Sequence, residues 1–184
     1  NGVVNQEMLG WACAYAQNSN KDLLELYCGI GNFTIPLSKH YRRVLATEVS
    51  KVATRAAQET LVLNEVDNVA FARLAAEEVT QAMNGEREFR RLKSLDPRLS
   101  DYDLATVFVD PPRAGLDDGT ARLCQKFNQI LYISCNPLTL IDNLKSLSVT
   151  HRIQALAFFD QFPYTHHLEC GVSLTRRGAH ESTN

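Results

Sequence analysis

Residues 22–34 read Asp-Leu-Leu-Glu-Leu-Tyr-Cys-Gly-Ile-Gly-Asn-Phe-Thr, and this stretch decides the fold. An apolar run of strand length ends in a turn that contains Gly29 and Gly31, and a helical pattern follows. Because glycine has no side chain, a ligand can approach the backbone at such a turn. The stretch therefore predicts the first strand, turn and helix of an open α/β sheet, with a ligand site at the turn.

The same alternation of β-rich runs and helical patterns continues along most of the chain. Strands are expected at 22–28, 43–48, 68–73, 104–110, 129–135, 152–160 and 169–177. Helices are expected at 5–17, 32–40, 51–64, 75–84, 117–127 and 137–147. Only about eight residues separate the last two strands, too few for a helical crossover, so the final strand should be antiparallel. The pattern predicts a seven-stranded, mostly parallel, doubly wound sheet.

The composition is that of one ordinary globular domain. The chain has 184 residues, 45% hydrophobic content and a formal charge of -2, which does not resemble the basic composition of a free-standing nucleic-acid binder and weakens any RNA-binding claim made from charge alone. No apolar stretch is long enough to cross a membrane and no signal peptide is apparent, so we expect a cytoplasmic protein. The charge-dense segment 85–101 is expected to be a surface loop or a short exposed helix.

The cysteines predict neither disulfides nor a metal site. They are odd in number and form no CxxC pair: Cys13, Cys28, Cys124, Cys135 and Cys170. His166, His167 and Cys170 lie close together in the sequence, but no fourth ligand is nearby, so we expect no metal.

Glu48 narrows the class of ligand. It ends the second predicted strand, about twenty residues after the glycine turn, where a carboxylate can accept both hydroxyls of a ribose. A nicotinamide dinucleotide would suit this arrangement, but Thr34 replaces the third glycine of the GxGxxG motif. The antiparallel last strand favours instead the Rossmann-like class I fold of S-adenosylmethionine-dependent methyltransferases.

Asp110-Pro-Pro-Arg113 follows the fourth predicted strand. Two prolines make a rigid turn that holds Asp110 at the edge of the sheet. Methyltransferases that act on exocyclic amino groups have a similar Asp/Asn-Pro-Pro motif followed by an aromatic residue, whereas this chain has Arg113. Amine methylation is therefore disfavoured but stays open as an alternative, as does a purely structural turn.

Cys135, in Ser-Cys-Asn-Pro, ends the fifth predicted strand at the same edge. A thiolate there could add to carbon 6 of uracil and make carbon 5 nucleophilic enough to be methylated. A base must then remove the carbon 5 proton, and Glu169 is our candidate, with His166 and His167 available to orient substrate or base. The alternative for each is structural, since cysteines are commonly buried and loop histidines commonly face solvent.

Four motifs, in order, resemble the RNA 5-methyluridine methyltransferase family, and its tRNA-modifying branch in particular. They are Glu-Leu-Tyr-Cys-Gly-x-Gly-Asn-Phe, Asp-Pro-Pro-Arg, Ser-Cys-Asn-Pro and Phe-Asp-Gln-Phe-Pro-Tyr-Thr-His-His-x-Glu-Cys. The resemblance runs from about residue 1 to residue 177, which we interpret as the catalytic domain, with a flexible tail at 178–184.

The resemblance implies S-adenosylmethionine as methyl donor, the T-arm of tRNA as partner, Cys135 as nucleophile and Glu169 as base. The implied donor-binding residues are Tyr27, Gly29, Gly31, Asn32, Phe33, Glu48 and Asp110. The residues implied to position the substrate are Arg113, Asn136, His166 and His167.

Full-length members of that family also carry an N-terminal portion that helps to grip RNA. Asn1 looks like the asparagine that follows a donor-contacting glutamine in those members, so we expect this chain to be the catalytic domain of a longer, monomeric enzyme. Three alternatives stay open: methylation of an rRNA uridine, methylation of an amino group, and a domain that binds donor without turnover.

Overall fold

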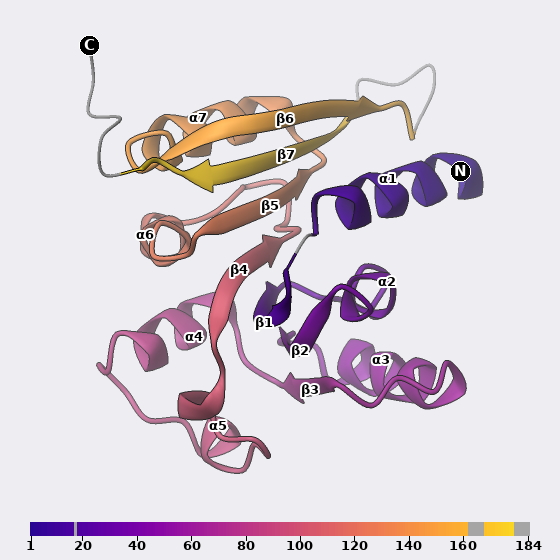
Figure 1. The fold of residues 1–184 in the computed structure, drawn as a ribbon, viewed down its shortest axis with the longest axis vertical. Helices are drawn as coiled ribbons and strands as arrows, with labels where there is room; N and C mark the ends of the chain where they lie inside the picture. Colours follow the sequence, from indigo (N-terminus) through magenta and orange to yellow (C-terminus); the bar gives the residue numbers. More distant parts are fainter. Residues whose placement is uncertain (17, 162–167, 179–184) are drawn as a thin grey trace.

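The structure, a computed structural model, describes residues 1–16, 18–161 and 168–178 (Figure 1). One seven-stranded sheet has the order β3-β2-β1-β4-β5-β7-β6. Strand β7 is antiparallel to β5 and β6, whereas β1, β2, β3, β4 and β5 pair in parallel. The predicted fold and the antiparallel last strand are confirmed.

The strands are β1 (Asn18–Leu26), β2 (Tyr41–Thr47), β3 (Val69–Ala72), β4 (Leu104–Val109), β5 (Gln129–Ser134), β6 (His151–Phe159) and β7 (Glu169–Arg176). The helices are α1 (Gly2–Tyr15), α2 (Thr34–Ser38), α3 (Lys51–Leu63), α4 (Ala76–Met83), α5 (Arg90–Lys93), α6 (Asp118–Cys124) and α7 (Pro137–Leu147), with a 3-10 turn η1 (Leu99–Asp101).

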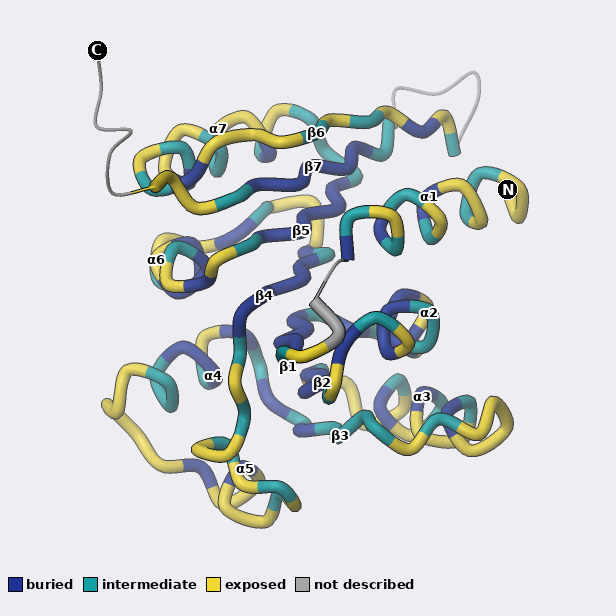
Figure 2. Tube along the Cα trace, in the orientation of Figure 1, coloured by how far each residue is buried: buried dark blue, intermediate teal, exposed yellow. Residues whose placement is uncertain are grey.

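Helices cover both faces of the sheet. Helices α1, α2 and α3 lie on one face, and α4, α6 and α7 lie on the other (Figure 1). Alternate residues of β1 point to opposite sides: Leu23 packs in the cluster that contains Met8 of α1, and Leu24 packs in the cluster that contains Val79 of α4. The central strands are accordingly buried on both faces (Figure 2).

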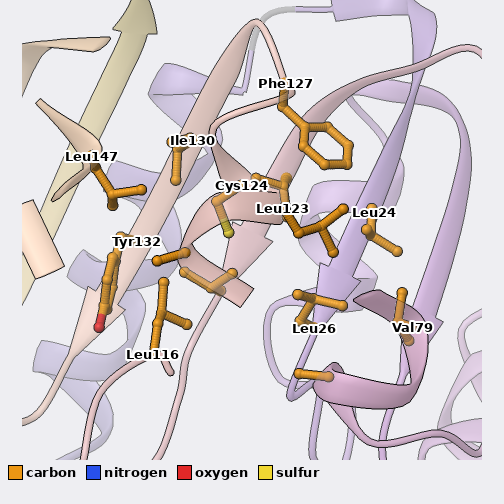
Figure 3. Close-up of a cluster of buried hydrophobic side chains, with 14 of the residues drawn as sticks. Leu24, Leu26, Val79, Leu116, Leu123, Cys124, Phe127, Ile130, Tyr132 and Leu147 are labelled. Atoms are coloured by element: carbon orange, nitrogen blue, oxygen red, sulfur yellow. The ribbon is translucent and has the colours of Figure 1, made fainter. Parts of the chain in front are cut away.

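The larger apolar cluster joins the sheet to α4, α6 and α7. Figure 3 shows Leu24, Leu26, Ile130 and Tyr132 from the strands packed with Leu123 of α6 and Leu147 of α7. Burial of this apolar surface is the main stabilising contribution that fixes the helices, and hence the loops that they carry, against the sheet.

Some boundaries differ from those expected. Strand β1 stops at Leu26 rather than at residue 28, because Tyr27 adopts a left-handed conformation with φ of 60°. Helix α2 starts at Thr34, two residues later than expected, because Gly29 and Gly31 also have positive φ angles of 54° and 88° and extend the turn.

The charged segment 85–101 was expected to be exposed, and this is only partly right. It contains α5 and η1, and its charged side chains are mostly exposed. However, Phe89 and Leu92 are 8% and 7% exposed and belong to the larger apolar cluster. Two apolar anchors therefore hold this charged segment against the domain.

Candidate active site

The glycine turn is fixed from the end of the second strand. Glu48 follows β2, and its carboxylate accepts hydrogen bonds from the backbone N–H of Gly29 at 3.1 Å and of Ser50 at 2.8 Å. Ser50 in turn caps α3 by accepting a hydrogen bond from the Ala53 N–H. Glu48 is therefore held at the carboxyl edge of the sheet beside the turn, where the sequence placed it.

A cleft of about 240 Å³ opens beside this turn. Its lining includes Tyr27, Glu48, Val49, Leu74, Glu77 and Pro112, from the ends of neighbouring strands and the loops that follow them. The mixture of apolar walls with carboxylates suits a nucleoside. Two larger hollows, about 470 Å³ beside α5 and about 450 Å³ between α4 and α6, contain none of the predicted site residues.

The sequence around Cys135 forms a strand-to-helix turn. Ser134 ends β5, and its hydroxyl both accepts from the Asn136 N–H and donates to the Asn136 carbonyl, each at 3.1 Å. Asn136 is the N-cap of α7, accepting a hydrogen bond from the Leu138 N–H, and Pro137 occupies the first helical turn. Cys135 is thus presented, half-buried, at the tip between the two elements.

Antiparallel pairing brings Glu169 to Cys135. Ser134 pairs with Cys170 across β5 and β7, so the next step of the register sets Cys135 opposite Glu169, the first residue of β7. Burial raises the pKa of the Cys135 thiol, the carboxylates of Glu169 and Asp110 raise it further, and Arg113 partly offsets them. The two candidates for nucleophile and base, 34 residues apart in the sequence, therefore share one site.

Asp110 completes an acidic group at this edge. It follows β4 directly, and burial together with the charge of Glu169 raises the pKa of Asp110 to about 7. Burial also raises the pKa of Glu169. A carboxylate with a raised pKa is a better proton acceptor near neutral pH than an exposed one.

The sequence motif included Glu25, but no role was inferred for it. Glu25 is fully buried in β1, and neither carboxylate oxygen makes a hydrogen bond of ordinary geometry to a described residue. Burial raises the pKa of Glu25 to about 8, the nearby Thr34 hydroxyl offsets this in part, and Asp110 adds to it. A glutamate inside an apolar strand run was the sequence signal for this group.

The loop that carries Asp110 and Arg113 is bonded to the turn that carries Cys135. The carbonyl of Arg113 accepts hydrogen bonds from the Asn136 amide at 3.0 Å and from the Thr139 hydroxyl at 3.1 Å. Asn136, predicted to position the substrate, thus uses its side chain to cap α7 and to hold this loop. The Arg113 side chain is free to face solvent at the edge of the site.

The remaining predicted residues lie in three environments. Asn32 is exposed and exchanges two hydrogen bonds with Asn5 of α1, at 3.0 and 3.2 Å. Phe33 is only 4% exposed and packs on Phe108, with ring centroids 4.8 Å apart, so it supports the glycine turn from the core side. His166 and His167 lie outside the described residues, as does the predicted tail except for Gly178.

The described part of the chain contains neither a cluster of metal-ligating side chains nor a helix that could span a membrane. Among residues 1–16, 18–161 and 168–178, no three His, Cys, Asp or Glu side chains are placed to hold a metal ion. None of the helices in these ranges has the length and apolar character needed to span a bilayer.

The sheet order, the antiparallel last strand and the glycine turn beside an acidic residue define the class I methyltransferase fold. The sequence model of the tRNA (uracil-5-)-methyltransferase family matches residues 1–177. The chain belongs to this family.

Named relatives and a solved structure agree with this assignment. The tRNA/tmRNA (uracil-C(5))-methyltransferase of Dickeya chrysanthemi is 58% identical over 177 residues, and that of Acinetobacter baylyi is 59% identical over 174 residues. These alignments cover 96% and 95% of this chain but 48% of each relative, so the chain spans about half the length of the curated relatives it matches.

The crystal structure of Pyrococcus abyssi tRNA (uracil-54, C5)-methyltransferase in complex with S-adenosyl-L-homocysteine superposes with a TM-score of 0.68. It is 27% identical, and the match covers 93% of this chain and 38% of that chain. The N-methyltransferase NodS of Bradyrhizobium japonicum, at 12% identity, also has a TM-score of 0.68, over 94% of this chain and 87% of that chain. This second likeness concerns the fold alone.

Proposed function

We propose that this chain is the donor-binding and catalytic part of an enzyme that methylates carbon 5 of a uridine in tRNA. The observation that carries the proposal is the pairing of β5 with β7, which sets Cys135 opposite Glu169 beside Asp110. An amine-directed methyltransferase has no use for a thiol opposite a carboxylate, whereas carbon 5 of uracil needs both.

The residues at the glycine turn fit S-adenosylmethionine. Gly29 and Gly31 both have positive φ angles, and an added Cβ at Gly29 would meet no atom within 4 Å, so a ligand can approach the backbone at Gly29. Tyr27 and Glu48 line the adjacent cleft, which would take the nucleoside, and Glu48 would accept the ribose hydroxyls. When bound, this donor supplies a methyl group activated by its sulfonium.

Cys135 acts first on the target ring. The thiol loses its proton to solvent, the thiolate sulfur forms a bond to carbon 6 of uracil, and the electron pair of the carbon 5–carbon 6 double bond moves toward the carbon 4 carbonyl. Carbon 5 thereby becomes a carbon nucleophile. Asp110 lies close enough to Cys135 for its charge to raise the pKa of the thiol, and we assign it to the junction of donor and target ring.

Glu169 completes the reaction. Once carbon 5 carries the methyl group, the Glu169 carboxylate accepts the proton from carbon 5, and the carbon 6–sulfur bond breaks as the double bond re-forms. The raised pKa of Glu169, caused by burial, suits a base that works near neutral pH.

The names of the relatives support tRNA as the substrate class, and the T-loop uridine is our choice within it. A half-buried thiol reaches the face of a uracil ring only if the base leaves its stack, so we expect a flipped-out uridine. The formal charge of -2 on this chain indicates that phosphate contacts depend in part on the other half of the relatives' length.

Location of the methyl group tests the proposal. The protein is incubated with S-adenosylmethionine and unmodified tRNA, the RNA is digested to nucleosides, and these are analysed by mass spectrometry beside a Cys135→Ser control. We expect 5-methyluridine from the wild type alone. An N-methylated nucleoside would overturn the carbon 5 assignment, and turnover by the control would overturn the role of Cys135.

A further inference from the structure

Asn143, in the second turn of α7, joins three parts of the domain that meet beside the active site. Its Oδ1 accepts hydrogen bonds from the Leu116 N–H at 2.8 Å and from the Tyr132 hydroxyl at 2.7 Å. Its Nδ2 donates to the Leu116 carbonyl at 3.0 Å. One amide therefore pairs with both backbone groups of Leu116, in the loop after Asp110, and with a side chain from β5.

Tyr132 is fully buried in the same apolar cluster as Leu116, which is 6% exposed (Figure 3). Bonds to both the N–H and the carbonyl of Leu116 fix which way the Asn143 amide faces, since an amide turned over would set donor against donor. Breaking this contact would leave the Tyr132 hydroxyl and the Leu116 backbone groups without partners in a buried setting, which is costly.

The chain makes room for this contact at Gly115. Gly115 has φ of +76°, and its N–H donates to the Pro112 carbonyl at 2.8 Å, closing a turn. An added Cβ would lie 2.6 Å from the Asn143 Oδ1 and 3.2 Å from the Thr139 Cβ. Only glycine allows α7 to approach the loop so closely.

We propose that Asn143 is a positioning residue, which sets the Asp110–Arg113 turn relative to Cys135 by holding the backbone of Leu116. It touches no reacting atom itself. Asn136 and Thr139 also bond to the Arg113 carbonyl, and α7 begins two residues after Cys135, so this helix is the common support of both catalytic loops. This inference rests on the proposed function, since it concerns the geometry of that reaction.

A matched control separates positioning from stability. Asn68 is also an amide that bonds loop backbone: its Nδ2 donates to the carbonyls of Ser38 and Tyr41 at 2.9 and 3.1 Å. It precedes the edge strand β3, which lies four positions away from β5 in the sheet order. Asn143→Ala and Asn68→Ala should therefore lower the melting temperature similarly but differ in function.

The functional readout is the rate of covalent adduct formation with a T-arm RNA that carries 5-fluorouridine, beside the donor Kd from calorimetry. For Asn143→Ala we expect a rate about 10- to 100-fold lower, because an ångström-scale displacement of catalytic groups has that effect. The donor Kd should change by a smaller factor than the adduct rate, since Tyr27 and Glu48 lie on other loops and Pro112 is the one residue of the displaced turn that lines the nucleoside cleft. Asn143→Asp keeps an oxygen that can accept from the Leu116 N–H and the Tyr132 hydroxyl but loses the N–H that donates to the Leu116 carbonyl, so its rate of adduct formation should lie between those of Asn143→Ala and the wild type. Asn68→Ala should react at the wild-type rate.

A second readout needs no RNA. Burial is the largest cause of the raised pKa of Cys135, followed by the charges of Glu169 on β7 and of Asp110, whereas Arg113 lowers this pKa. Drift of the Asp110–Arg113 turn would remove the opposed effects of Asp110 and Arg113 together, so it would act on the thiol mainly by exposing it. Alkylation of Cys135 by iodoacetamide at pH 8, followed by peptide mass spectrometry, should then be at least threefold faster in Asn143→Ala than in Asn68→Ala. Equal alkylation rates would overturn the inference. An adduct-negative wild type would count against the proposed function instead.

Discussion

Replacement of Glu25 by glutamine should make the domain more stable, and increasingly so as the pH rises. The wild-type carboxyl is fully buried with no ordinary hydrogen bond, and burial raises its pKa from 4.5 to about 8. Glutamine has nearly the same shape as the protonated acid and stays neutral at every pH. The variant therefore removes the cost of ionising this site and little else.

The magnitude follows from proton linkage. The folded protein holds the Glu25 proton between pH 4.5 and about 8 while the unfolded chain has released it, so the stability of the wild type falls as the pH rises through this window. At about 1.4 kcal/mol per pH unit, the loss is about 1 kcal/mol at pH 5, about 3 kcal/mol at pH 7 and about 5 kcal/mol above pH 8. Glu25→Gln should gain these amounts over the wild type.

Urea unfolding at pH 5, 7 and 8.5 measures the difference directly. Glu59→Gln, which removes an exposed carboxylate of α3, is the control, and it should alter stability by less than about 1 kcal/mol. If the free energy of unfolding of Glu25→Gln parallels that of the wild type from pH 5 to pH 8.5, then Glu25 is not the buried acid described above.

Three further predictions concern single contacts. Glu169→Gln should still form the Cys135 adduct but lower turnover by about 10²- to 10⁴-fold, so that methylated adduct accumulates on a denaturing gel; unchanged turnover would remove Glu169 as the base. Gly171→Ala should cost about 1 to 3 kcal/mol, because the new Cβ would lie 2.8 Å from the Trp11 ring, and a Trp11→Leu background should abolish most of that loss in urea unfolding. Cys135→Ala should eliminate methyl transfer while calorimetry finds the donor Kd within about twofold of the wild type, because the thiol is not part of the nucleoside cleft.

The sheet could be predicted from the sequence because the patterns that specify its strands and helices are local in the sequence. Apolar runs of strand length, helical periodicity between them and the short connection before residue 169 determine strand number, order of elements and the direction of β7. The edge at which Cys135 and Asp110 meet follows from the same pattern, since both end strands of one parallel sheet.

Contacts between loops could not be predicted in this way. The bonds of Asn143 to Leu116 and Tyr132 depend on the distance between α7 and a turn 27 residues earlier, which periodicity does not specify. The full burial of Glu25 depends on tertiary packing, which brings Thr34 of α2 beside its carboxylate. Phe89 and Leu92, the two apolar anchors of segment 85–101, lie among charged residues in the sequence, so the pattern did not mark them as core residues. The end of β1 and the start of α2 differ from the predicted positions because positive φ angles extend the glycine turn between them.

Covalent trapping tests the central claim most directly. The protein is incubated with S-adenosylmethionine and a T-arm RNA that carries 5-fluorouridine, because fluorine at carbon 5 cannot leave as a proton does and the adduct persists. A protein–RNA band that resists denaturation, with the RNA bonded to Cys135 by peptide mass spectrometry, is the predicted result. A band of equal intensity from Cys135→Ala, or attachment at another residue, would contradict the assignment of Cys135 as the nucleophile.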